Sequence, residues 1–313
     1  MLLALLGIVG GLALLTLAAD QFVVGAARVA ISARMSKVVV GAVVIGFGTS
    51  LPEMVISALA SAQGSIDLAV GNIVGSNIAN LTLVLGTAAL ITPITVRVDI
   101  LKREALLSLA AVAVFGLVVV LGPIGLGDAL LLGGVFTAAM AFIVYDARQG
   151  DELLAQEVDQ FVAAGSPFGE WLRALLGLVG TLAASQLVVW SATNLADRLG
   201  LTEGFVGLTL VAVGTSLPEL ASSIQAARKG ETDLLIGNLL GSNLFNAGAV
   251  GTAVALAGAG QEATGTVAGI GVVLMIGVAV VATFSMFTGR RVVKMEGAFL
   301  LAVFVVCIPL LAG

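Results

Sequence analysis

The sequence predicts an all-α membrane protein in which ten transmembrane helices form two inverted five-helix repeats. Three observations support this fold class. Of the 313 residues, 59% are hydrophobic and 11% are charged, whereas a soluble domain usually carries about 25% charged residues. Apolar runs of about 20 residues, long enough to cross a bilayer, recur along the whole chain. Two polar motifs inside those runs occur twice, at one constant offset. A chain of this composition needs the lipid bilayer as its solvent.

The expected spans are separated by short charged segments, and no polar stretch between them is long enough for a soluble domain. Their boundaries follow from the ends of the apolar runs. The ten spans are expected at residues 2–27, 38–62, 66–91, 104–121, 128–145, 168–195, 204–227, 233–258, 266–287 and 293–312.

Basic residues are concentrated on one side of this arrangement. The loops that follow spans 1, 3, 5, 7 and 9 share a side and contain 13 of the 14 Lys and Arg residues, and Arg198 is the exception. Short loops rich in Lys and Arg stay in the cytoplasm. We therefore expect a multi-pass protein of the cell membrane with both termini extracellular.

The internal repeat rests on two duplicated motifs. Residues 48–53 and residues 214–219 both read Gly-Thr-Ser-Leu-Pro-Glu, an offset of 166 (214 − 48). The second motif reads GNIVGSNIAN from Gly71 and GNLLGSNLFN from Gly237, again 166 residues apart (237 − 71). Because five spans is an odd number, the second copy must enter the membrane from the opposite side, as in inverted-repeat transporters.

This repeat divides the chain into two units. Residues 1–150 are expected to form the first five-helix repeat, with its motif region at 41–90. Residues 168–313 are expected to form the inverted second repeat, with its motif region at 207–256. The segment 151–167 between them is expected to be a short, acidic cytoplasmic linker, because it is too short for a folded domain.

Each repeat places one glutamate, Glu53 or Glu219, in the middle of a span. A charge at the bilayer centre costs at least about 3 kcal/mol. Neither span offers a basic residue at the same depth, so the expected partner is a bound cation or a proton. Pro52 and Pro218 also lack an N–H group and disrupt the helix, which frees backbone carbonyls that lipid cannot satisfy. These features predict broken helices 2, 3, 7 and 8 around a midplane ion site.

Neutral oxygen atoms surround the two glutamates in the sequence. Serine and asparagine lie four residues apart in each second motif, which places both on one helix face. Carboxylate, hydroxyl and amide oxygens are hard ligands that suit Ca²⁺ or Na⁺ and not soft metals. Simple hydrogen bonding between helices is the alternative role for the neutral residues. The candidate ligands are Glu53, Glu219, Thr49, Ser50, Ser76, Asn80, Thr215, Ser216, Ser242 and Asn246.

Four further asparagines accompany these candidates. Asn77 and Asn243 are expected to support the ligands from behind and to close the helix break, and Asn72 and Asn238 are expected to act in the same way. The single cysteine and the absence of histidine exclude an internal disulfide and cysteine- or histidine-based metal sites. No nucleophile–base pair, nucleotide loop or redox centre is evident, so we expect neither an enzyme nor a cofactor. The net charge of −5 argues against nucleic acid as a partner.

The duplicated motifs resemble the alpha-repeats of the sodium/calcium exchanger family, within the cation/calcium antiporter superfamily, in a minimal prokaryotic form. The resemblance covers nearly the whole chain. It implies that Glu53 and Glu219 bind both ions, with the neutral candidates completing the sites. It also implies that the backbone carbonyls of Gly46 and Ala212 are ligands. In such proteins spans 1 and 6 slide across the other eight, and a monomer suffices.

The function that the resemblance implies is secondary active, electrogenic exchange of Na⁺ for Ca²⁺ by alternating access. Several relatives carry Asp where this chain has Asn246, and its absence implies independence from K⁺. An H⁺/Ca²⁺ antiporter, or an antiporter of another divalent cation, is the alternative. A Ca²⁺-permeable channel is less favoured, because channels usually arrange acidic rings by symmetric assembly of subunits. Asp20, whose repeat counterpart is Ser185, is expected to face water or the membrane interface near the ion path.

Overall fold

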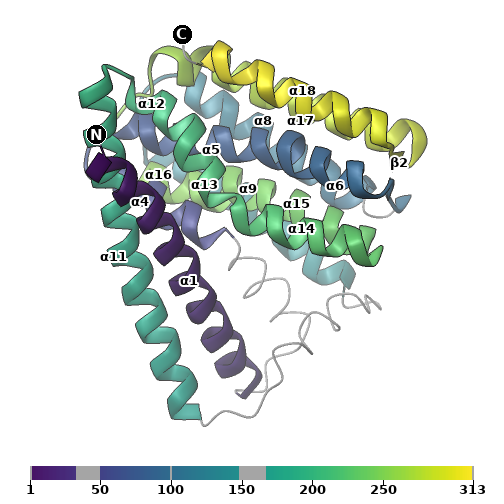
Figure 1. The fold of residues 1–313 in the computed structure, drawn as a ribbon, viewed down its shortest axis with the longest axis horizontal. Helices are drawn as coiled ribbons and strands as arrows, with labels where there is room; N and C mark the ends of the chain where they lie inside the picture. Colours follow the sequence, from purple (N-terminus) through teal and green to yellow (C-terminus); the bar gives the residue numbers. More distant parts are fainter. Residues whose placement is uncertain (1, 33–49, 99–100, 148–166, 312–313) are drawn as a thin grey trace.

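The computed structural model describes residues 2–32, 50–98, 101–147 and 167–311, and almost all of them are helical (Figure 1). The first half contains α1 (Leu2–Ser32), α4 (Leu51–Ala62), α5 (Ile66–Ala79), the π-helical segment η2 (Asn80–Val84), α6 (Leu85–Ile91), β1 (Ile94–Thr95), η3 (Leu101–Ala105), α8 (Leu106–Val120) and α9 (Leu126–Ala147). The second half contains α11 (Pro167–Leu199), α12 (Glu203–Val206), η4 (Gly207–Val211), α13 (Ala212–Thr215), α14 (Leu217–Lys229), α15 (Thr232–Phe245), η5 (Asn246–Val250), α16 (Gly251–Ala257), η6 (Val267–Gly271), α17 (Val272–Gly289), β2 (Arg291–Val292) and α18 (Lys294–Leu311).

The chain is an all-helical, multi-pass membrane protein. Within the described residues, eight helices are long and apolar enough to cross a membrane, and the bent pair from Glu203 to Lys229 makes a ninth candidate. The expected second span, 38–62, is described only from residue 50, and its visible part is the shorter apolar helix α4. The full set of ten spans therefore stays a prediction.

The same helical boundaries occur twice, 166 residues apart. α5, η2 and α6 begin at residues 66, 80 and 85, and α15, η5 and α16 begin at 232, 246 and 251. Figure 1 shows the first series running toward the end of the molecule that carries β2 and the second series running away from it. At that same end β1 and β2 pair antiparallel, with Ile94 opposite Val292. The two series of helices thus run in opposite directions across the molecule.

The predicted helix breaks are only partly present. The seventh span is bent by 42° between α13 and α14, at Ser216, as Pro218 predicts. The predicted breaks in the third and eighth spans are wrong, because residues 66–91 and 232–257 each form one continuous span. Neither span contains a proline, so no backbone N–H group is lost. Each instead contains a π-helical turn, which begins at Asn80 in one and at Asn246 in the other.

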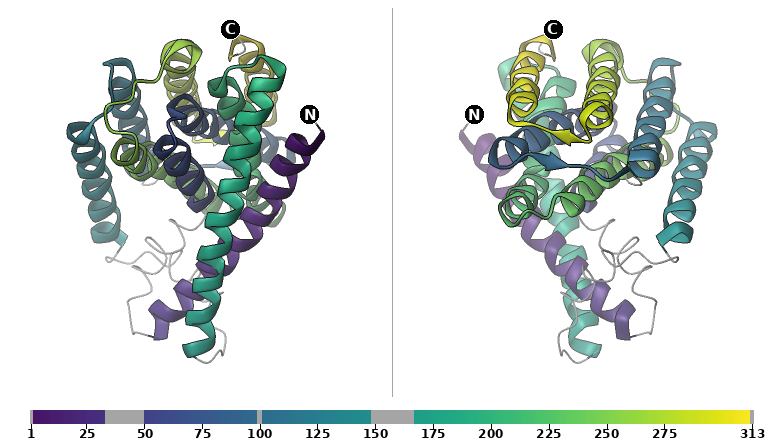
Figure 2. Two further views of the ribbon diagram at one scale, coloured as in Figure 1. Left: turned by 90° about the vertical axis from the view of Figure 1, so that its left-hand side faces the viewer. Right: turned by 90° about the vertical axis from the view of Figure 1, so that its right-hand side faces the viewer.

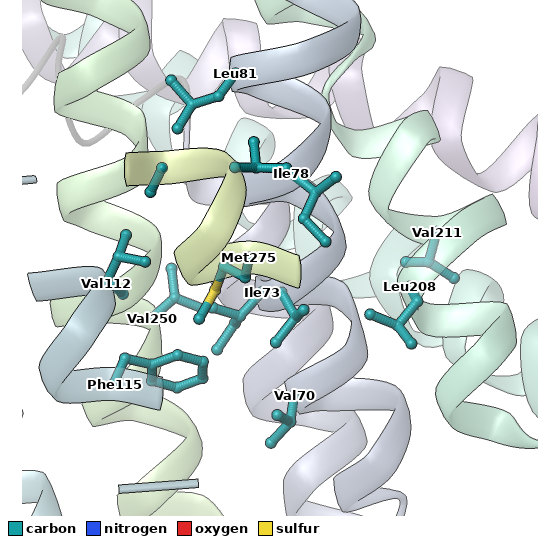
Figure 3. Packing of buried hydrophobic residues seen from close by; sticks show 14 of the residues in the cluster. Val70, Ile73, Ile78, Leu81, Val112, Phe115, Leu208, Val211, Val250 and Met275 are labelled. Carbon is teal, nitrogen blue, oxygen red and sulfur yellow. The ribbon is translucent and has the colours of Figure 1, made fainter. Parts of the chain in front are cut away.

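Helix α5 occupies the centre of the molecule. A Cβ atom at Gly71 would lie 2.7 Å from the carbonyl oxygen of Gly204, and one at Gly75 would collide with the carbonyl of Leu208. These glycines let the backbones of α5, α12 and η4 approach closely, as small residues do between membrane helices. Figure 3 shows Ile73 of α5 between Met275 of α17 and Leu208 of η4.

Helices α1 and α11 form a separate pair. They run side by side and extend beyond the other helices at one end (Figures 1 and 2). Glycines again permit the close approach, since a Cβ atom at Gly25 would lie 2.7 Å from the backbone nitrogen of Ala174. An ion pair of 2.9 Å between Arg28 and Glu170 joins the two helices near the extended end. The sequence-expected spans 1 and 6 are therefore in contact along their length.

Candidate cation site

Glu53 and Glu219 meet in the interior of the molecule. Each lies in the first turn of its helix, α4 or α14, directly after a proline that the first turn tolerates. The positive end of each helix dipole therefore faces its carboxylate. The exposed fractions are 0% for Glu53 and 1% for Glu219, and the two carboxylates are close enough to repel each other. The local sequence thus places two buried carboxyl groups beside one another.

The carboxylate oxygens are unsatisfied. Among the described residues, none of the four oxygens of Glu53 and Glu219 has a hydrogen-bond partner. The hydroxyls of Thr215 and Ser242 lie near the carboxylates of Glu53 and Glu219, respectively, without completing a hydrogen bond of good geometry. Burial of an unpaired carboxylate is strongly unfavourable, so such groups are paired, protonated or bound to metal ions. A cation or protons are therefore needed to neutralise the two buried carboxyl groups.

Hydroxyl groups from both repeats surround the carboxylates. Thr215 ends α13, and its Oγ1 lies 3.4 Å from Oγ of Ser76 on α5. Ser50 precedes α4 and Ser216 precedes α14, and both hydroxyls are buried without a hydrogen-bond partner in the described part of the chain. Ser242 on α15 is also a buried residue, with 2% exposure. These buried hydroxyls come from α5, α13 and α15 and from the residues that precede α4 and α14.

The amide side chains are arranged less symmetrically. Asn80 donates a hydrogen bond of 3.0 Å from Nδ2 to Oδ1 of Asn243, which in turn donates to the carbonyl of Asn77 at 3.4 Å. Asn77 donates from Nδ2 to the carbonyl of Ile73 in its own helix, at 2.8 Å. Asn246 is buried, and neither its amide nitrogen nor its amide oxygen has a partner within the described ranges. Asn80 and Asn246 begin the π-helical turns, a feature common at functional sites.

The predicted carbonyl ligands, Thr49 and the acid Asp20 stand as follows. The carbonyl of Ala212 already accepts the Thr215 hydroxyl at 3.2 Å and the backbone N–H of Ser216 at 3.0 Å. A cation at that carbonyl would have to replace the hydroxyl hydrogen bond. Thr49 and Gly46 lie outside the described residues. Asp20 is exposed on α1, and its Oδ2 accepts a hydrogen bond from the neighbouring Gln21 at 3.1 Å.

Ser57 and Asn72 lie next to Glu53 and were not among the ligands predicted from the sequence, although Asn72 was expected to support the ligands. Ser57 lies one helical turn after Glu53, and its hydroxyl accepts a hydrogen bond of 3.0 Å from Nδ2 of Asn72. The same amide nitrogen lies 3.5 Å from the carbonyl oxygen of Glu53. The internal repeat could have identified this position, because a serine follows each glutamate by four residues. Ser57 follows Glu53, and Ser223 follows Glu219 at the same offset of 166 residues.

The donor set is rich in oxygen and carries little charge. In the described residues, no group of three or more Asp, Glu, His or Cys side chains is placed to hold a metal ion. The site therefore combines two carboxylates with neutral hydroxyl and amide oxygens. Such a set matches Ca²⁺, which accepts six to eight oxygen ligands in flexible geometry.

Comparison with known proteins places this arrangement in a family. The family model described as "Sodium/calcium exchanger protein" matches residues 3–145 and 170–312, nearly the whole chain in two segments. The chain belongs to the sodium/calcium exchanger family. It is thus a cation/calcium antiporter of the membrane, and the family is one of transporters, not enzymes.

Individual relatives agree with this assignment. The chain is 38% identical over 328 residues to the putative antiporter CaxA of Alkalimonas amylolytica, covering 97% of each chain. It is 28% identical over 274 residues to the sodium/calcium exchanger MaX1 of Methanosarcina acetivorans, covering 75% of this chain and 78% of MaX1. A solved structure of the sodium-calcium exchanger NCX_Mj, soaked with 2.5 mM Na⁺ and 0.1 mM Ca²⁺, superimposes with a TM-score of 0.65. That match has 28% identity and covers 99% of this chain and 98% of NCX_Mj.

Proposed function

We propose that this protein exchanges Na⁺ for Ca²⁺ by alternating access, with Glu53 and Glu219 as the carboxylates that both ions share. The observation that carries the proposal is the pair of buried carboxylates whose four oxygens lack hydrogen-bond partners among the described residues. A single Ca²⁺ ion, or two Na⁺ ions, would neutralise both charges. Because the two ions compete for the same oxygens, binding of one displaces the other, and this competition couples their movements.

The neutral oxygens support binding of hard cations. Ser50, Ser76, Thr215, Ser216 and Ser242 supply buried hydroxyl groups around the glutamates. Asn80 and Asn246 begin the irregular turns in which a helix can present its polar groups to an ion. Gly46, Thr49 and Ala212 complete the proposed ligand set, with Asn77 and Asn243 holding the ligands from behind.

We further propose electrogenic, K⁺-independent exchange. A third Na⁺ in each cycle would move one net charge, because two carboxylates balance only two of the three Na⁺ charges. The amide of Asn246, in place of a third carboxylate, favours independence from K⁺. The finer architecture is proposed as well: two inverted five-span repeats in a monomer of the cell membrane, with an acidic cytoplasmic linker and both termini extracellular.

The decisive experiment is ⁴⁵Ca²⁺ uptake into proteoliposomes loaded with Na⁺. An outward Na⁺ gradient should drive uptake, and replacement of internal Na⁺ by choline should abolish it. An inside-positive potential should accelerate uptake if net positive charge leaves with Na⁺, and external K⁺ should otherwise have no effect. Uptake driven by a pH gradient and indifferent to Na⁺ would instead establish H⁺/Ca²⁺ exchange. Uptake that needs no counter-ion would establish a channel.

A further inference from the structure

The first repeat contains a buried amide that links three elements. Asn72 of α5 is 0% exposed, and its Nδ2 donates a hydrogen bond of 3.0 Å to the hydroxyl of Ser57 on α4. Its Oδ1 lies 3.4 Å from the hydroxyl of Thr215, which belongs to the other repeat. One side chain thus holds α4, which carries Glu53, against α5 and against a residue of the site.

The equivalent contact is not formed in the second repeat. Ser223 and Asn238 stand 166 residues after Ser57 and Asn72 (223 − 57 and 238 − 72). The Ser223 hydroxyl is buried, with 1% exposure of the residue, and has no hydrogen-bond partner among the residues that the structure describes. Asn238 is half-buried instead of fully buried. The sequence therefore supplies the same pair twice, and this conformation uses it once.

A second repeated contact shows the same asymmetry. Asn80 donates to Asn243 at 3.0 Å across the two repeats. The pair related to it by the repeat is Asn246 with Asn77. Within the described residues, Nδ2 of Asn246 and Oδ1 of Asn77 both lack hydrogen-bond partners. One amide pair is therefore closed and its counterpart is open.

The packing of α4 and α14 differs in the same direction. Leu51 of α4 is 2% exposed, whereas Leu217, its counterpart on α14, is 50% exposed. α11 packs against α4, and Gln186 of α11 bonds Gln63 just beyond α4 at 2.7 Å. No comparable contact joins α1 to α14 in the described part of the chain. Within the described residues, α11 covers α4, whereas the matching position on α14, Leu217, is exposed.

We propose that Asn72 and Asn238 are positioning residues that alternate as latches, so that Asn72–Ser57 holds α4 closed in this conformation and Asn238–Ser223 holds α14 closed in the opposite one. The inference rests on the alternating access of the proposed function. Two arrangements built from the same residues with exchanged roles are close in free energy, as a two-state equilibrium requires. The unpartnered hydroxyl of Ser223 disfavours the present arrangement, and the Asn72–Ser57 bond that would break disfavours the other.

The test compares accessibility at two matched positions. Val55 on α4 and Ala221 on α14 are 166 residues apart (221 − 55), with Val55 buried and Ala221 exposed. Each is replaced by cysteine in a Cys307→Ser background, which removes the one native thiol. A charged methanethiosulfonate reagent then labels the protein in lipid nanodiscs, where both faces meet the reagent. The measured quantity is the ratio of the labelling rate at position 55 to that at position 221.

Asn72→Ala should raise this ratio about threefold, and Asn238→Ala should lower it about threefold, the change that one membrane hydrogen bond of about 0.6 kcal/mol produces. Ser57→Ala and Ser223→Ala should reproduce the two shifts and serve if an asparagine variant fails to fold. If Asn72 and Asn238 only stabilised the fold, the two alanine variants would not shift the labelling ratio in opposite directions. Shifts in the same direction, or no shift in any of the four variants, would overturn the latch.

Labelling is performed in choline buffer without Na⁺ or Ca²⁺, so the result does not depend on the transported ions. Opposite shifts in a protein that shows no Na⁺-driven Ca²⁺ uptake would support the latch and defeat the proposed exchange. Normal Na⁺-driven Ca²⁺ exchange with an unchanged labelling ratio would support the proposed exchange and defeat the latch.

Discussion

Asn80 and Asn243 join the two repeats through a buried hydrogen bond of 3.0 Å from Nδ2 to Oδ1. Both residues come from the duplicated GSN-x-x-N motif, but from different positions within it. The bond therefore joins the start of η2, directly after α5, to α15. In the counterpart pair, Nδ2 of Asn246 and Oδ1 of Asn77 have no partners among the residues that the structure describes, so only one of the two repeated contacts is formed there.

Replacement of either glutamate should abolish Ca²⁺ exchange. Glu53→Gln and Glu219→Gln each remove one of the two charges that neutralise Ca²⁺, and loss of one partner of a buried charged pair costs about 2–5 kcal/mol. Ca²⁺ binding should therefore weaken by about 30-fold or more. The measurement is ⁴⁵Ca²⁺ flux in proteoliposomes, with the exposed acid variant Asp20→Asn as the matched control. Full activity in either glutamine variant would remove that residue from the site.

The same substitutions should stabilise the protein when no cation is present. Burial of two ionisable carboxyl groups beside each other is unfavourable when no cation is bound, and glutamine removes one of the two. In Na⁺- and Ca²⁺-free detergent solution, Glu219→Gln should unfold at a higher temperature than the wild type, as followed by the fluorescence of Trp171 and Trp190. Addition of Ca²⁺ at about 100 times its Kd should stabilise the wild type by about 2.7 kcal/mol. At the same Ca²⁺ concentration, a site weakened 30-fold or more should gain less than about 1 kcal/mol. A lower unfolding temperature for the variant in cation-free buffer would contradict this account.

Asn246→Leu separates a ligand role from a packing role. Both polar atoms of this buried amide lack partners within the described residues, so replacement by an apolar side chain of similar size should preserve or raise stability. As a proposed ligand, Asn246 is needed for transport, and exchange should fall at least about fivefold, the equivalent of about 1 kcal/mol. Flux and thermal unfolding are measured on the same preparation. A stable variant with normal flux would show that Asn246 does not bind the cation.

Gly75→Ala should disrupt the contact between α5 and η4. A Cβ atom at Gly75 would collide with the backbone carbonyl of Leu208, which cannot rotate away as a side chain can. We expect a loss of stability of about 1–3 kcal/mol. Gly134→Ala on α9 is the matched control, since nothing lies within 4 Å of a Cβ atom there, and alanine is the better helix former. Unfolding temperatures measured in one detergent compare the two, and equal stability would contradict the close backbone contact.

Much of the site was predictable because the chain carries it twice. The 166-residue offset identified Glu53 and Glu219, and it located the serine and asparagine positions of α5 and α15 within one turn. A duplicated acid within an apolar span has few physical explanations, since lipid gives it no partner. The predicted helix breaks at residues 66–91 and 232–257 failed for a local reason: without proline, a π-helical turn accommodates the irregularity without interrupting the helix.

The sequence by itself determined that the protein lies in a lipid bilayer, that its motifs are duplicated, and that its candidate ligands are oxygen atoms. Composition requires a bilayer, and the motifs place hard oxygen donors beside two buried acids. The tertiary structure alone decided which of the repeated contacts is formed. Ser57 and Ser223 are the same residue in the same motif, yet the first has a partner and the second, within the described residues, has none. A sequence repeat specifies two equivalent sets of contacts, and the described conformation forms the Ser57 contact and not its Ser223 counterpart. The choice between them is therefore made by packing in three dimensions.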